Sequence, residues 1–378
     1  MPIVSFEAGG TASRLVGRIN SVGYRASILF AFAPLLAGAG CQRGPATPRQ
    51  GTSVGVTASA LDGLYKLQER IPLQQPDSAL IVRVSGIDRR ADGAIALGDA
   101  SEGNVKLYSP SGRLLRVIGR KGQGPGEFQE PRFPRFGENH RLYVADGAGG
   151  RVSIFDSAGT LLRTLQLGRA TFLMGFEIIP NGGGFLFSSE DADGYVLFRT
   201  DSTGKPSRRF LRIRDTHPRD QPAESPWRSV RGFSIALHGD TAFVVCTLSD
   251  SLWTVNLRSG VESAVRLSLP DYKIPVPPAQ PLTSMAELMK WSRSLQLAVS
   301  MTASDSTLLI NFTRGVLSAG DPNTAAIRSA DGRWNAVSQA PAFLRGVGPD
   351  LLALASAGDS SSGAVVLGVY GPALGSRP

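Results

Sequence analysis

The sequence predicts an all-β fold, a six-bladed β-propeller of four-stranded antiparallel blades with one inserted helix. Three observations predict it: a motif repeated at intervals of about 45 residues, an abundance of turn residues, and an early segment able to supply a missing strand. The 378 residues include 44 glycines and 25 prolines. This composition fits many short strands joined by tight turns better than it fits a helical bundle.

The repeat is clearest between the segments that begin at Gly93 and His140. Each contains an alternating run that ends at an aspartate, a turn, a second strand ending in an aromatic residue, a tight turn with glycine, and a third strand. Such a meander is antiparallel, and a period in the forties is typical of propeller blades. Three matched pairs share one offset of 47 residues: Asp99 and Asp146, Tyr108 and Phe155, Gly112 and Gly159.

Weaker copies follow, beginning with a similar turn at Asp201 to Gly204, and six units can be counted. The last unit lacks one strand, which the early segment Tyr65 to Leu73 could supply. Closing the ring with both ends of the chain would remove exposed sheet edges. A β-sandwich with a chance repeat is the alternative, and the sequence leaves six and seven blades open.

A helical insertion is expected at residues 283–299, after the proline-rich stretch Ile274 to Pro281. Ser284 and Glu287 have the spacing of a capping box. Met285, Leu288, Leu295 and Val299 fall near one helical face, with Trp291 beside it. We favour packing of this face against the propeller, and a lid over one mouth of the channel is the alternative.

The N-terminal residues 1–40 have the pattern of a secretory signal peptide. Arginines precede the uncharged apolar run Ala26 to Ala37, and three small residues follow it. A buried core helix is the alternative, which Pro34 disfavours. Cys41 comes next, so the segment resembles bacterial lipoprotein precursors, although Gly38 stands where that family usually has leucine. The resemblance implies lipidation of Cys41, and residues 41–60 are then expected to form a flexible tether to a propeller at residues 61–378.

Gly119 to Pro131 reads GRKGQGPGEFQEP. This run resembles a family of bacterial six-bladed β-propeller lipoproteins related to NHL-repeat propellers, which implies a periplasmic or surface location and no catalytic set. The loop would join two blades at the rim of one face, where four side chains could contact a ligand: Arg120, Lys121, Gln123 and Glu127. We favour the alternative in which Glu127 and Phe128 only fix the crossover between blades.

Other polar residues give weaker signals. Asp99 and Asp146 are expected to bond to turn amides rather than to a ligand in the channel. Glu190, Asp191 and Asp193 only weakly resemble a calcium-binding loop. No cofactor is therefore expected, and calcium binding is a weakly supported alternative. The chain has two cysteines and three scattered histidines, and no serine-hydrolase motif. No catalytic or metal-ligating residue is therefore assigned.

The formal net charge is +9, without a recognised nucleic-acid-binding motif, so nucleic acid is not expected as a partner. The leading hypothesis is an exported, membrane-anchored binding module, periplasmic or on the cell surface. It would be a monomer that binds a small molecule, a glycan or a protein. The alternative is a propeller enzyme of the lyase or lactonase type with a metal in the central channel, which the shortage of histidine disfavours.

Overall fold

The structure of the chain is a computed structural model. It describes residues 53–168, 172–213, 231–269, 278, 282–293, 295–304, 307–314, 323–329, 331–341, 344–347, 350–356 and 364–373. Cys41, the predicted signal peptide and the first part of the predicted tether lie outside these residues. Within the part of the chain that the structure describes, no helix is both long and apolar enough to cross a membrane.

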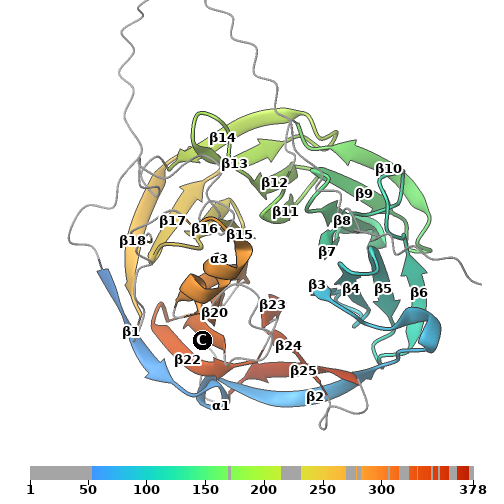
Figure 1. The fold of residues 1–378 in the computed structure, drawn as a ribbon, viewed down its shortest axis with the longest axis horizontal. Coiled ribbons are helices and arrows are strands. Elements are labelled where there is room, and N and C mark those ends of the chain that lie inside the picture. Colours follow the sequence, from blue (N-terminus) through green and yellow to red (C-terminus); the bar gives the residue numbers. More distant parts are fainter. Residues whose placement is uncertain are drawn as a thin grey trace, which may run out of the picture. The chain divides into compact units, whose positions relative to one another are not determined.

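Six four-stranded antiparallel blades form the described protein, which confirms the predicted fold class and the lower of the two blade counts (Figure 1). In the first five blades the strands follow one another along the chain from the inside of the ring outward. The first three blades are β3 (Val84–Arg89), β4 (Ile95–Asp99), β5 (Asn104–Tyr108) and β6 (Leu114–Ile118); β7 (Pro131–Phe136), β8 (Leu142–Asp146), β9 (Arg151–Phe155) and β10 (Leu161–Gln166); and β11 (Gly175–Ile179), β12 (Gly184–Ser188), β13 (Tyr195–Thr200) and β14 (Pro206–Arg212).

The remaining blades differ in how the chain supplies their strands. Blades four and five are consecutive, whereas blade six takes its outer strand, β2, from the N-terminal side. They are β15 (Phe233–His238), β16 (Thr241–Cys246), β17 (Ser251–Asn256) and β18 (Glu262–Ser268); β19 (Gln296–Ala303), β20 (Leu308–Arg314), β21 (Asn323–Arg328) and β22 (Trp334–Ala340); and β23 (Arg345–Val347), β24 (Asp350–Ser356), β25 (Val365–Pro372) and β2 (Tyr65–Leu73).

Strand β2 closes the ring as the sequence predicted. It pairs antiparallel with β25 from Tyr65 opposite Pro372 to Leu73 opposite Val365, and Figure 1 shows the blue β2 beside the red β25. Both edges of the last blade are thereby provided by segments from opposite ends of the described chain. This pairing covers a sheet edge that would otherwise be open to other chains.

The core is divided into six apolar clusters among the described residues, and each lies mainly between two neighbouring blades. Middle strands such as β4 are buried along their whole length, because both of their faces contact another blade. Outer strands such as β10 are largely exposed. One cluster for each of six interfaces is what a closed ring of radial sheets requires.

Strand β1 (Ser53–Ser59) lies within the segment predicted to be a flexible tether, so the tether ends earlier than residue 60. It runs parallel to two outer strands in turn: Ser53 is opposite Arg266 of β18, and Val56 is opposite Trp334 of β22. The unpaired outer edges of blades four and five supply its hydrogen-bond partners, and Val54 and Val56 pack against the cluster between those blades. The polar composition of residues 42–52 concealed this short alternating run.

The helical insertion is shorter than predicted. Helix α3 (Met285–Ser292) ends at Ser292, and the chain is already in β19 from Gln296, so the last residues of the helix expected over 283–299 are strand. The reason is that Leu297 and Ala298 alternate between two blade interfaces, a period of two that a helical reading overlooks. A second, four-residue helix, α1 (Leu61–Leu64), leads into β2.

The predicted capping box is present at the start of α3. The Glu287 N–H donates to Ser284 Oγ at 3.2 Å, and Thr283 N–H donates to Glu287 Oε2 at 2.7 Å. Leu288 is buried in the cluster between blades three and four, and α3 lies inside the ring of blades in the view of Figure 1. The contact supports the expected packing of the helix against the propeller, whereas a lid role stays a prediction.

Candidate functional site

The glycine-rich loop joins β6 to β7 and is held by its own side chains. Arg120 Nε donates to Glu127 Oε1 at 2.8 Å, and the Gly124 N–H donates to Glu127 Oε2 at 2.9 Å. These bonds, that from Gly124 first, hold the pKa of the Glu127 carboxyl below its ordinary value. Lys121 Nζ donates to the carbonyl oxygens of Ala100 at 3.0 Å and Gln129 at 2.7 Å.

Phe128 fixes the same loop from the inside. Its side chain is fully buried between blades one and two, with its ring centroid 6.1 Å from that of Phe155. Arg151 donates to the carbonyl oxygens of Gln123 and Glu127. Of the four predicted ligand contacts, Arg120, Lys121 and Glu127 therefore bond within the crossover, and the Gln123 side chain is exposed. This arrangement supports the structural alternative, and ligand binding by the loop stays a prediction.

The two repeated aspartates hold their blades together. Asp99 accepts hydrogen bonds from the N–H groups of Val82 at 2.8 Å and Arg83 at 3.1 Å, and Lys106 Nζ donates to it at 3.0 Å. Both members of this ion pair are fully buried. Burial alone would raise the pKa of the Asp99 carboxyl, but the bonds from Val82 and Lys106 outweigh it and the net shift is downward.

Asp146 repeats the arrangement in blade two. It accepts hydrogen bonds from the N–H groups of Gln129 at 3.0 Å and Glu130 at 2.7 Å, and Arg151 Nη2 lies 3.3 Å from its Oδ2. The expected bonding of both aspartates to backbone amides is thus observed. The offset of 47 residues marks the aspartate of a structural ion pair in blades one and two, whereas the basic partners, Lys106 and Arg151, stand at different places in the repeat.

The acidic hairpin between β12 and β13 is occupied by arginines. Arg209 Nη1 lies 3.0 Å from an Asp191 oxygen and 2.6 Å from an Asp193 oxygen, and Glu190 pairs with Arg231. Among the described residues, no group of three or more histidines, cysteines, aspartates or glutamates could hold a metal ion.

A charged cluster on the inner strands is the polar feature that the sequence reading missed. Arg135 of β7 makes a two-pronged contact with Glu177 of β11, at 3.2 and 3.1 Å. Arg345 Nη2 of β23 lies 3.4 Å from Asp88 Oδ1 of β3, and the Phe136 N–H donates to Asp88 Oδ2 at 2.8 Å. We call Asp88, Arg135, Glu177 and Arg345 the channel cluster. The sequence signal was weak, because the first strands of these units carry other charges as well, Arg89 in β3 and Arg132 in β7.

The channel cluster is mostly buried and keeps some access to solvent. The side chains of Arg135 and Glu177 are 9% and 16% exposed, and those of Arg345 and Asp88 are 16% and 11% exposed. Burial, followed by the charge of Arg135, lowers the pKa of the Arg345 guanidinium. Arg345 Nε is buried and has no hydrogen-bond partner among the described residues. The Nε atoms of Arg89, Arg151 and Arg231 are likewise buried without a hydrogen-bond partner among the described residues, so this property does not by itself mark a ligand site.

Comparison with known proteins agrees with this architecture. Residues 56–211 match the DUF5128 family model, a 6-bladed beta-propeller. The matched part of the propeller contains blades one to three together with β2, and so includes the glycine-rich loop and three members of the channel cluster. No curated protein matches the sequence.

Solved structures with low sequence identity share the propeller fold. One is a Bacteroides fragilis NCTC 9343 protein described as exported, with 13% identity and a TM-score of 0.58, which covers 84% of this chain and 98% of its own. Another is a Bacteroides vulgatus member of the DUF4221 family, with 10% identity and a TM-score of 0.56 over 82% of this chain and 98% of its own. At these identities the likeness shows the fold alone.

Proposed function

We propose that the protein is an exported, lipid-anchored propeller that binds a polar ligand or protein partner and does not catalyse a reaction on it. The anchor rests on the lipoprotein-like sequence that ends at Cys41. Two acyl chains on this cysteine would hold the chain stably at a membrane, whereas one would not. The propeller would then face an extracytoplasmic space.

The channel cluster is the observation that carries the binding function. Four inner strands, β3, β7, β11 and β23, bring two guanidinium groups and two carboxylates together beside the channel. Structural stability alone gives little reason for such a cluster, because apolar residues of similar volume are often as stable as a buried ion pair. Partly exposed charges held on rigid strands are suited to fixing the orientation of a polar ligand.

The charges of the channel cluster indicate the chemistry of that ligand. The guanidinium of Arg345 is partly exposed, and its Nε has no acceptor among the described residues, so a ligand that offers a carboxylate or carbonyl oxygen would bond to it. Glu177 and Asp88 are close by and would accept bonds from ammonium or hydroxyl groups. A small molecule, glycan or peptide end that carries both kinds of group fits the cluster.

The anchor is tested by intact mass and membrane fractionation of the full-length protein beside Cys41→Ala. The wild type is expected in the membrane fraction with an acylated N-terminal cysteine, and the variant in the soluble fraction. If the wild type is soluble and unprocessed, the proposed location is refuted, while ligand binding by the channel is unaffected.

Binding is tested by thermal unfolding of the full-length protein with amino acids, acidic sugars and short peptides. A ligand present at 100 times its Kd stabilises the folded state by about 2.7 kcal/mol. We expect one probe or more to raise the Tm of the wild type and to lose this effect in Arg345→Gln. Arg113→Gln is the matched control, since Arg113 is exposed on the turn between β5 and β6. Equal shifts in all three proteins, or no shift with any probe, would refute the site.

A further inference from the structure

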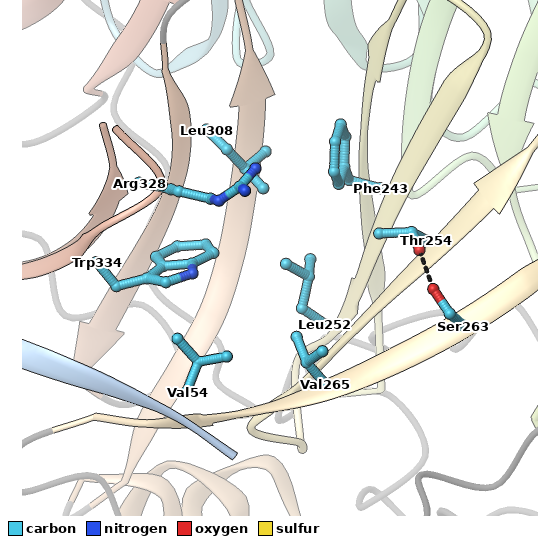
Figure 2. Close-up of a pocket in the computed structure, with 10 residues that line it drawn as sticks. Val54, Phe243, Leu252, Thr254, Ser263, Val265, Leu308, Arg328 and Trp334 are labelled. Atoms are coloured by element: carbon cyan, nitrogen blue, oxygen red, sulfur yellow. Dashed lines mark hydrogen bonds between the residues drawn. The ribbon is translucent and has the colours of Figure 1, made fainter. Parts of the chain in front are cut away.

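Blades four and five flank a partly open cavity of about 250 Å³ next to β1 (Figure 2). Trp334 of β22 and Leu308 of β20 form the wall on blade five, and Phe243 of β16 faces them from blade four. Val54 of β1 and Leu252 of β17 line it as well. The walls are therefore mainly apolar, with two aromatic side chains on opposite sides.

The radial arrangement of the blades explains why space is left at this interface. Neighbouring sheets diverge toward the outside of a propeller, so the outer positions need large side chains to fill the gap. Between blades four and five the lining includes the small residues Thr254, Ser263 and Gly332 instead. The hydroxyls of Thr254 and Ser263 bond to each other, so one of the two O–H groups is already used as a donor (Figure 2).

Arg328, the last residue of β21, supplies the positive charge of the cavity. Its side chain lies beside Trp334 and extends toward Phe243 in Figure 2. The residue is exposed, and no carboxylate pairs with it within the described ranges. Arg333, five residues later, differs in this respect, since its Nε lies 3.4 Å from Asp331 Oδ2. A guanidinium without a counter-charge beside an aromatic slot is suited to an anionic group on an apolar ligand.

We propose that this cavity binds a small aromatic carboxylate, with its ring between Trp334 and Phe243 and its carboxylate on Arg328. The size of the cavity limits the ligand. An apolar cavity of about 150 Å³ accepts benzene. A volume of about 250 Å³ therefore has room for one aromatic ring with a short acid arm. The site is separate from the channel cluster and does not depend on the proposed function.

The probe for the test is 3-phenylpropanoate, titrated into the full-length protein by calorimetry and followed by the change in tryptophan fluorescence. We expect a Kd between about 10 μM and 1 mM, as is usual for a ligand of this size. The neutral analogue 3-phenylpropanol keeps the ring and lacks the charge. It is expected to bind about tenfold more weakly or worse, because a hydrogen bond to a charged group is lost.

Two substitutions assign the binding to the cavity. Arg328→Gln is expected to weaken binding of the acid about tenfold or more and to leave binding of the alcohol unchanged. Thr254→Leu reduces the cavity volume and is expected to weaken both ligands. The control is Arg333→Gln, which removes the same charge from the neighbouring turn and is expected to leave both affinities unchanged. The unfolding midpoint of each variant shows that it is folded.

The outcomes decide the proposal. Absence of binding by the wild type up to roughly 5 mM overturns it, since such a site would lie outside the affinity expected of this ligand class. Equal affinity for acid and alcohol, or an unchanged affinity in Arg328→Gln, overturns the assignment of the carboxylate to Arg328. Loss of binding in Arg333→Gln to the same degree would show general attraction to positive charge, which also contradicts the site.

Discussion

Replacing Lys106 by methionine tests how strongly the buried ion pair holds blade one. Lys106 Nζ donates to Asp99 Oδ2 and to Asn104 Oδ1, each at 3.0 Å, and both charged side chains of the pair are fully buried. Methionine keeps the unbranched apolar stem in its place and removes the charge. Asp99 then keeps its hydrogen bonds from backbone N–H groups but loses its counter-ion.

Removal of one partner from a buried ion pair costs about 3–5 kcal/mol. The backbone N–H groups that remain on the Asp99 carboxylate compensate in part, so we expect a value of about 3 kcal/mol, at the lower end. For a protein of this size, that corresponds to a fall in Tm of roughly 5 °C.

The effect should also depend on pH. The pKa of Asp99 is lowered in the folded protein, so its stabilisation is present above the ordinary pKa of an aspartate and is lost as the pH falls through the folded value. Without Lys106 the folded pKa rises, and acid unfolding should therefore begin at a higher pH in the variant than in the wild type.

Urea unfolding, followed by circular dichroism at several pH values, measures both effects. Lys66→Met is the matched control, because Lys66 is exposed on β2 and the charge change is the same. The reasoning is refuted if Lys106→Met costs less than about 1 kcal/mol, or if both variants lose stability in parallel with pH.

Three further changes test other parts of the fold. Phe128→Ala removes a fully buried ring that contacts Phe155, and should cost about 3–5 kcal/mol in urea unfolding; a cost below about 1 kcal/mol would contradict a role in the crossover. Gly112→Ala puts a Cβ 2.1 Å from the Pro72 carbonyl oxygen at a φ of 80°, so we expect weakened closure by β2 and faster proteolysis of the N-terminal segment. Cys246 is buried and burial raises the pKa of its thiol, so a thiol reagent should modify it only upon unfolding, and rapid modification of the native protein would argue against that burial.

The sequence was informative wherever a residue type has a strong preference for one local conformation or one local hydrogen bond. Glycine and aspartate at fixed turn positions revealed the repeat, because few other residues adopt those conformations. The missing strand in the last unit led to Tyr65–Leu73, which is β2 to the residue. Ser284 and Glu287 marked the start of α3 for the same reason, since their bonds involve only neighbouring residues.

Features that depend on distant segments were not predictable from one sequence. Asp88, Arg135, Glu177 and Arg345 are isolated charges along the chain, and only the ring brings them together. Strand β1 forms no hairpin with a neighbouring segment of the chain, and its only partners among the described strands are the distant edges of β18 and β22. The cavity between blades four and five likewise depends on residues of several strands, which no local pattern connects.

The position of β2 has a consequence for the order of folding. Tyr65 leaves the ribosome early, yet its partner Pro372 lies about 300 residues later. The ring therefore cannot close before the last blade has been synthesised. Until then the backbone groups of β2 lack their hydrogen-bond partners in β25. Pairings of such long range make closure a late and slow step, in which aggregation competes with folding. Loss of the final strand would accordingly remove the closure of the whole ring, although it deletes only a few residues.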